Sequence, residues 1–163
     1  MKLNEKTKRF VDLTTRLSVK ASSSDGLIHV DMRPNTRPQL SIPDDYRTRY
    51  SPDGMGRQLS AVFTKAFAGK RRGIELALEK SFGKLEDHRK DTDIIAQRKL
   101  ASTTTESSSP DGTVVVQCHG AQRFEVTLNE RTFGRHSAEA LTEQVMSAIN
   151  RVCQEQKRIE HRA

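Results

Sequence analysis

The sequence predicts an α+β fold in which one unit, a helix, a small antiparallel hairpin and a second helix, occurs twice in tandem. Two observations lead to this prediction. A serine-rich Asp-Gly turn followed by alternating apolar residues occurs at 22–30 and again at 108–116. The apolar helix pattern that follows the first of these segments also returns after the second. Half of the 163-residue chain is a marginal length for independent folding, so we expect both units to share a core as a pseudo-symmetric intramolecular dimer.

The repeat extends beyond the turn. Six identities link residues 22–42 to residues 108–128 at an offset of 86 positions, and the helix pattern Leu59, Phe63, Ala66 recurs at an offset of 82. The difference corresponds to a four-residue insertion in the first connection, where insertions cost little. An Asp-Gly turn before any alternating strand would look similar by chance. The shared order of turn, strand, arginine and helix favours a duplication.

Each unit is expected to contain the same elements. The Asp-Gly turn tolerates a positive φ, and Ile28, Val30 and Met32 alternate so that they share one face of a strand. A tight turn leads to a second strand at 37–42 or 122–128, with a third extended piece near 46–50 or 131–135. The closing amphipathic helix begins after Ser51-Pro52 in the first unit and after Ser137 in the second.

Leading helices complete the predicted units. Apolar spacing predicts helices over 3–19 and from 74 to 100, the latter continuing from the closing helix before it with a kink near Gly69 or Gly73. The unit boundaries are 1–73 and 74–163. The segment 102–109 is rich in Ser and Thr and is interpreted as a mobile loop.

These elements resemble the YbaB/EbfC family of nucleoid-associated proteins. The second unit matches best, through Ser109-Pro-Asp-Gly-Thr-Val-Val-Val, Val126-Thr-Leu and the helix that contains Ala138, Leu141 and Val145. The resemblance implies two fused units, each of a kind that usually dimerises through its sheet, with helices projecting like tweezers. It also implies binding to DNA with little sequence preference. Relatives linked to type VII secretion loci have no settled DNA role.

No arrangement of reactive side chains predicts chemistry. The five histidines are His29, His88, His119, His136 and His161. None of them stands at a metal-ligand spacing from another ligand, and no phosphate loop or nucleophile motif occurs. We therefore expect no catalytic residue, no metal and no cofactor, and the protein is not expected to be an enzyme. Cys118 and Cys153 are interpreted as unpaired core residues.

The positive charge lies in the first half of the chain. Residues 1–81 hold 16 Lys/Arg and 9 Asp/Glu, a net +7, whereas residues 82–163 hold 12 of each. The candidate DNA-binding residues are the densest cationic cluster and two arginines of the inserted connection: Lys65, Lys70, Arg71, Arg72, Arg47 and Arg49. The alternative is a solvated helix end whose cations complement the helix dipole. Arg37 and Arg123 occupy equivalent positions and are either structural or directed at DNA.

The favoured function is a bacterial nucleoid-associated protein that binds double-stranded DNA non-specifically, in the cytoplasm and without a membrane segment. The alternative is an adaptor or chaperone for a protein partner, for example one linked to a type VII secretion system. A single stripe of cations favours DNA, whereas scattered charge beside an exposed apolar groove favours a protein. Both a monomeric pseudo-dimer and a homodimer remain open.

Overall fold

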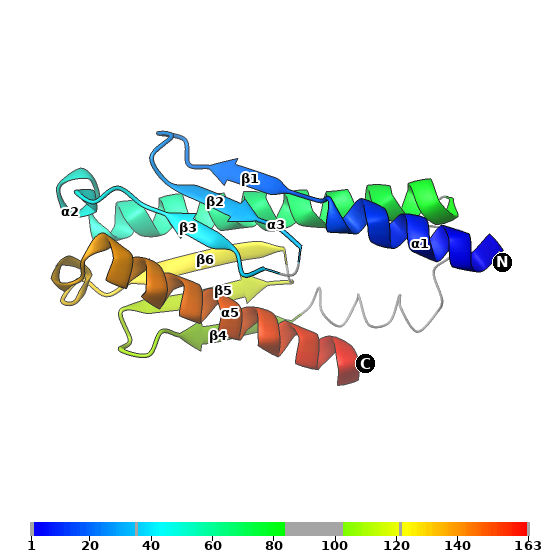
Figure 1. Ribbon diagram of the computed structural model, residues 1–163. Helices are drawn as coiled ribbons and strands as arrows, with labels where there is room; N and C mark the ends of the chain where they lie inside the picture. The colour runs from blue at the N-terminus through cyan, green and yellow to red at the C-terminus, as the bar shows by residue number, and fades with distance from the viewer. Residues whose placement is uncertain (1, 35, 84–102, 121, 163) are drawn as a thin grey trace.

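The computed structural model describes residues 2–34, 36–83, 103–120 and 122–162, which form an α+β fold with two small sheets (Figure 1). The elements of the first part of the chain are α1 (Lys2–Thr15), β1 (Val19–Ser22), β2 (His29–Met32), β3 (Gln39–Ser41), α2 (Tyr46–Arg49) and α3 (Pro52–Phe82). Those of the second part are β4 (Thr104–Ser108), β5 (Val114–His119), β6 (Arg123–Leu128), a 3-10 helix (Phe133–Arg135) and α5 (Ala138–Arg162).

Both sheets are antiparallel and have three strands in chain order, β1-β2-β3 and β4-β5-β6. Val30 pairs with Leu40 in the first sheet, and Val116 pairs with Val126 in the second. The predicted alternation is confirmed, since Ile28, Val30 and Met32 are all buried. Because each sheet buries one face only, its other face keeps polar side chains in water.

The two Asp-Gly turns have the same hydrogen bonds. In the first turn, Asp25 accepts from the backbone N–H of Leu27, and the hydroxyl of Ser23 accepts from the N–H of Ile28. In the second, Asp111 and Ser109 accept from Thr113 and Val114 in the same way. Gly26 and Gly112 have φ of 74° and 78°, a region that glycine enters without strain.

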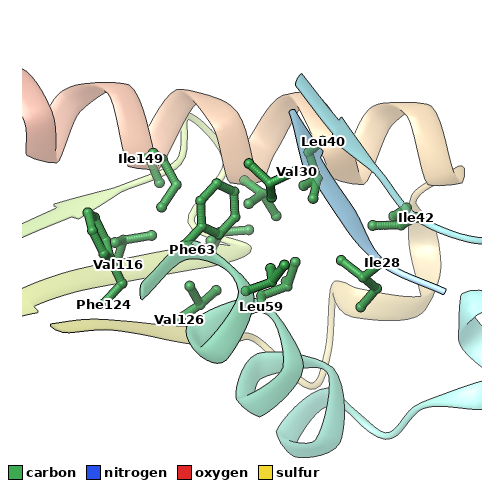
Figure 2. Close-up of a cluster of buried hydrophobic side chains, with 14 of the residues drawn as sticks. Ile28, Val30, Leu40, Ile42, Leu59, Phe63, Val116, Phe124, Val126 and Ile149 are labelled. Carbon is green, nitrogen blue, oxygen red and sulfur yellow. The ribbon is translucent and has the colours of Figure 1, made fainter. Parts of the chain in front are cut away.

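A single hydrophobic core lies between the sheets and the two long helices. Figure 2 shows Phe63 of α3 among side chains of both sheets and of α5, including Val30, Val126 and Ile149. Helix α3 contacts β1 and β2 as well as β6, and α5 contacts β4 and β5 as well as β3. Each long helix therefore packs on its own sheet and also reaches a strand of the other one.

Helix α3 closes the free edge of β6. The hydroxyls of Ser60 and Thr64 accept hydrogen bonds from the outward N–H groups of Val126 (2.8 Å) and Phe124 (3.0 Å). Gly56 permits this close approach, because a Cβ there would lie 2.6 Å from the carbonyl oxygen of Val126. A helix that satisfies an edge strand in this way prevents the strand from pairing with another chain.

The interpretation of 102–109 as a mobile loop is wrong for its described residues. Thr104–Ser108 forms β4, an edge strand that pairs with β5 from Thr104↔His119 to Ser108↔Val115. Alternation places Thr105 in the buried layer and leaves Thr104 and Glu106 in water. A run of Ser and Thr suits such an edge, because one face of the strand stays hydrated and Thr is β-branched.

The predicted third extended pieces are also wrong. Residues 46–49 form the short helix α2, and residues 133–135 form the 3-10 helix. Burial of Tyr46 explains this local structure, since its hydroxyl donates to the carbonyl oxygens of Phe133 (2.7 Å) and His136 (2.6 Å). Tyr46 also meets Phe133 edge to face at 5.1 Å. One aromatic side chain thus joins the two connections.

The helix starts are confirmed, but two boundaries differ from the predictions. Ser51 caps α3 by accepting from the N–H of Gly54, and Ser137 accepts from Ala140 at the start of α5. The leading helix ends at Thr15, because residues 19–22 form β1, a strand that the sequence reading missed. Helix α3 continues through Gly69 and Gly73 to Phe82 as one helix. The rest of the predicted helix 74–100 lies outside the described residues.

The two cysteines form no disulfide with each other; Cys118 is buried and Cys153 is half-buried. Burial raises the pKa of the Cys153 thiol to about 11, while the nearby Lys70 and Lys157 act in the opposite direction. Among the described residues, no helix has the length and apolarity needed to cross a membrane.

Candidate nucleic-acid interface

Helix α1 packs against the second half of α3, and the pair extends beyond the strands toward the N-terminal end of the molecule (Figure 1). We call this helix pair the first arm; it consists of residues 2–16 and 65–82. The rings of Phe10 and Phe82 are 6.1 Å apart. Gly73 lets α1 approach, because a Cβ there would lie 2.4 Å from Leu17. The two helices therefore run antiparallel, with α1 held by close packing.

The first arm carries a large excess of positive charge. It holds ten Lys/Arg and four Asp/Glu, a net +6, whereas residues 103–162 hold seven and eight, a net −1. Within the arm, Lys65 and Arg72 are seven residues apart on α3 and so share a face about 10 Å apart along the axis. Lys65 donates to the carbonyl oxygen of Ser22 at 3.4 Å, and Arg72 lies 3.6 Å from Glu75. Both side chains are exposed, so these contacts are weak and leave the cations available to a polyanion.

Lys70 and Arg71 point elsewhere. Lys70 lies about 140° around α3 from Lys65, and it lines a cavity between α1, α3 and α5. Arg71 is half-buried and lies about 100° around the helix from each neighbour. The four cations therefore do not share one face of α3, and the alternative interpretation of the cluster as a solvated helix end is wrong. The helix continues ten residues beyond Arg72, and its cations point to three sides.

Arg47 and Arg49 do not join this group. They lie on α2, before the start of α3 at Pro52, about 20 Å or more along the helix axis from Lys65. Arg49 forms an ion pair with Asp45 (2.8 Å), which raises the pKa of Arg49 and lowers that of Asp45. The guanidinium of Arg47 lies 5.7 Å from the centre of the Tyr46 ring. Both arginines already have local roles at the other end of α3.

The structure adds cations of α1 and of the residue that follows it, which the sequence did not single out: Lys6, Lys8, Arg9 and Arg16, all exposed. Arg9 is two residues, or about 200°, from Val11, and Arg72 is likewise two residues from Ile74. Val11 and Ile74 both line the cavity, so Arg9 and Arg72 face away from it. We call the side of the first arm with Arg9, Lys65 and Arg72 the outward face. In the sequence, the excess of Lys and Arg over Asp and Glu within residues 1–20 could have indicated these cations.

The two equivalent arginines lie apart. Arg123 begins β6 and is exposed, opposite His119 in the ladder. Arg37 lines a groove of about 490 Å³ together with Arg151 and Glu143 of α5. Arg151 donates to the carbonyl oxygen of Ser108 at 3.0 Å, which ties it to the end of β4. In the described part of the chain, no group of three His, Cys, Asp or Glu side chains is arranged to hold a metal ion.

Comparison with known proteins identifies the family. The model of the YbaB/EbfC DNA-binding family matches residues 73–162, which is more than half of the chain. The match begins within α3 and covers the second sheet and α5. Neither the curated proteins nor the solved structures give a match. The chain belongs to the YbaB/EbfC DNA-binding family, whose members are nucleoid-associated.

Proposed function

We propose that this protein binds double-stranded DNA with little sequence preference, through the outward face of the first arm. The observation that carries the proposal is the +6 charge of this helix pair, in a chain that belongs to a DNA-binding family. Lys and Arg that contact phosphates release counterions and bind any sequence. The proposed contacts are Lys65 and Arg72 with Arg9 of α1, and Arg71 lies at the side of this face. Lys70, which lines the cavity on the opposite side of α3, contributes only to the net charge of the arm. Arg47 and Arg49 form at most a separate contact.

We further propose that the chain is a tandem duplication that folds as an intramolecular pseudo-dimer of two family-like units, 1–73 and 74–163. The matching turn hydrogen bonds support this, as does a second pair of contacts. The Tyr50 hydroxyl donates to Asp25, and His136 lies 2.8 Å from Asp111, at positions that are also 86 apart. One chain then supplies both halves of a dimer, so a monomer suffices for binding. The family leads us to propose action in the bacterial nucleoid, in the cytoplasm, without catalysis.

The experiment is a titration of random-sequence duplex DNA with the full chain, by fluorescence anisotropy at several salt concentrations. We expect log K to fall linearly with log salt, with a slope of about −0.9 for each phosphate contacted. Replacement of Lys65, Lys70, Arg71 and Arg72 by Ala is expected to weaken binding equally on every sequence and to flatten the slope by about two to four units. If the parent does not bind at low salt, DNA is not the partner.

One observation favours a second function, binding of a protein partner as an adaptor or chaperone. The candidate cations point to several sides of α3, and an apolar cavity lies beside them. This combination is typical of a protein-binding surface, whereas a single basic stripe is typical of a DNA-binding one. This second function would be supported if the parent did not bind DNA and if the immobilised full chain retained a defined protein partner that a cavity variant lost.

A further inference from the structure

A cavity of about 660 Å³ lies between the first arm, the β2–β3 hairpin and the end of α5. This volume falls within the range of about 300–1,000 Å³ that small-molecule sites occupy. Its walls are mainly apolar and come from four elements and a connection: Phe10, Val11, Leu17, Val19, Met32 and Ile74. Val11 is 49% exposed, so it lies at the rim, whereas Met32 is buried.

The charged side chains that line the cavity are all positive. They are Arg33 of the hairpin, Lys70 of α3 and Lys157 of α5, and no carboxylate is among the described lining residues. Arg33 lies 3.5 Å from Asp31 and is therefore already partly neutralised. For Lys70 and Lys157, no partner occurs among the residues whose side chains the structure describes.

Lys70 of α3 and Lys157 of α5 are both exposed and line the same cavity from two different helices. Both lower the pKa of the same half-buried thiol, that of Cys153 on α5, against the effect of its burial. Two like charges that line one cavity repel each other, and an anion bound between them removes that repulsion. An apolar wall without a ligand is also unfavourable in water, at about 25 cal/mol for each Å² that stays exposed.

We propose that this cavity binds an amphipathic anion, a carboxylate or phosphate head on an aliphatic chain. The head lies between Lys70 and Lys157, and the chain lies against Phe10, Leu17, Met32 and Ile74. The ammonium groups act as charge-assisted donors to the head, and the arrangement selects against a cationic head on the same chain. The site is distinct from the outward face, which lies on the other side of α1 and α3.

Isothermal titration calorimetry of the full chain with dodecanoate, below its micelle concentration, tests the proposal. Dodecyl phosphate measures the preference for the head, and dodecylammonium carries the same chain with the opposite charge. We expect one site per chain for both anions, and binding of dodecylammonium that is weaker by about tenfold or more. Because no DNA is present, failure of this test leaves the DNA proposal unaffected.

Two variants locate the site. Lys70→Met/Lys157→Met keeps the apolar stems and is expected to weaken dodecanoate binding by about tenfold or more. The charge-matched control Arg72→Met/Arg158→Met alters neighbouring residues of the same two helices, outside the cavity, and is expected to bind like the parent. Val11→Trp fills the rim and should also weaken binding while the cations remain. Circular dichroism establishes that each variant is folded.

Three results would overturn the proposal. The first is no heat of binding for either anion, and the second is equal affinity for dodecanoate and dodecylammonium. The third is equal loss of affinity in the lysine double variant and its arginine control, which would indicate general attraction to a basic protein rather than a built site.

Discussion

The closure of the β6 edge by α3 predicts how much the junction between the two sheets contributes to stability. In the variant Ser60→Ala/Thr64→Val, the N–H groups of Val126 and Phe124 lose their acceptors while the volume of the helix face is nearly preserved. An unsatisfied N–H costs about 1–3 kcal/mol, and these sites are half-buried, so we expect a total loss of about 2–4 kcal/mol. With a urea m-value of about 2 kcal/mol/M, the unfolding midpoint falls by about 1–2 M.

Urea denaturation followed by circular dichroism measures this loss. Thr142→Val is the matched control, because the Thr142 hydroxyl donates to the carbonyl oxygen of Ala138 in its own helix and serves no strand. We expect the control to change stability by less than about 0.5 kcal/mol. A double variant as stable as this control would refute the reasoning, since α3 would then contribute packing alone at the β6 edge.

Three further predictions follow from local geometry. Gly56→Ala is expected to destabilise the fold by about 1–3 kcal/mol in the same assay, whereas Gly134→Ala, whose added Cβ would lie 4.0 Å from a side-chain carbon of Arg47, should be nearly neutral. The thiol of Cys153, with its pKa raised to about 11 by burial, should react with a disulfide reagent at pH 8 far more slowly in the native than in the urea-unfolded protein. Hydrogen bonds, first that from Ser23, hold the pKa of Asp25 below 3.8, so its contribution to stability is present above pH 3.8 and lost as the pH falls through the lower folded-state pKa. The difference in unfolding free energy between the parent and Asp25→Asn should therefore become smaller below that pH. A difference that does not change with pH would contradict the assignment.

The strands that the sequence predicted are those with strong period-two patterns. Ile28, Val30 and Met32 alternate within a buried layer, and the Asp-Gly turns fix where each hairpin begins. β1 and β4 were missed because edge strands rich in Lys, Ser and Thr have no apolar alternation. The α2 segment was misassigned because its conformation depends on a tertiary contact, the burial of Tyr46 between the two connections.

The candidate site was predicted only in part, because a charge cluster in the sequence does not define a surface. Consecutive residues of a helix are separated by about 100° around its axis. Because α3 continues beyond Arg72, the side chains of Lys70, Arg71 and Arg72 point in different directions. Arg9 joins Lys65 and Arg72 only through the packing of α1 on α3, where Gly73 permits the close approach. The spacing of residues in the sequence does not predict this contact between α1 and α3.

The most direct test of the central claim is a comparison of two charge-matched triple variants in DNA binding. The first, Arg9→Ala/Lys65→Ala/Arg72→Ala, removes the outward face of the first arm. The second, Arg131→Ala/Arg135→Ala/Arg158→Ala, removes the same charge from the second half of the chain. We measure the affinity for random duplex DNA as a function of salt for both variants and for the parent. The account predicts that the first variant binds more weakly on every sequence and loses about two to three units of salt slope, while the second retains the slope of the parent. Equal losses in the two variants, or a slope unchanged in the first, would contradict it.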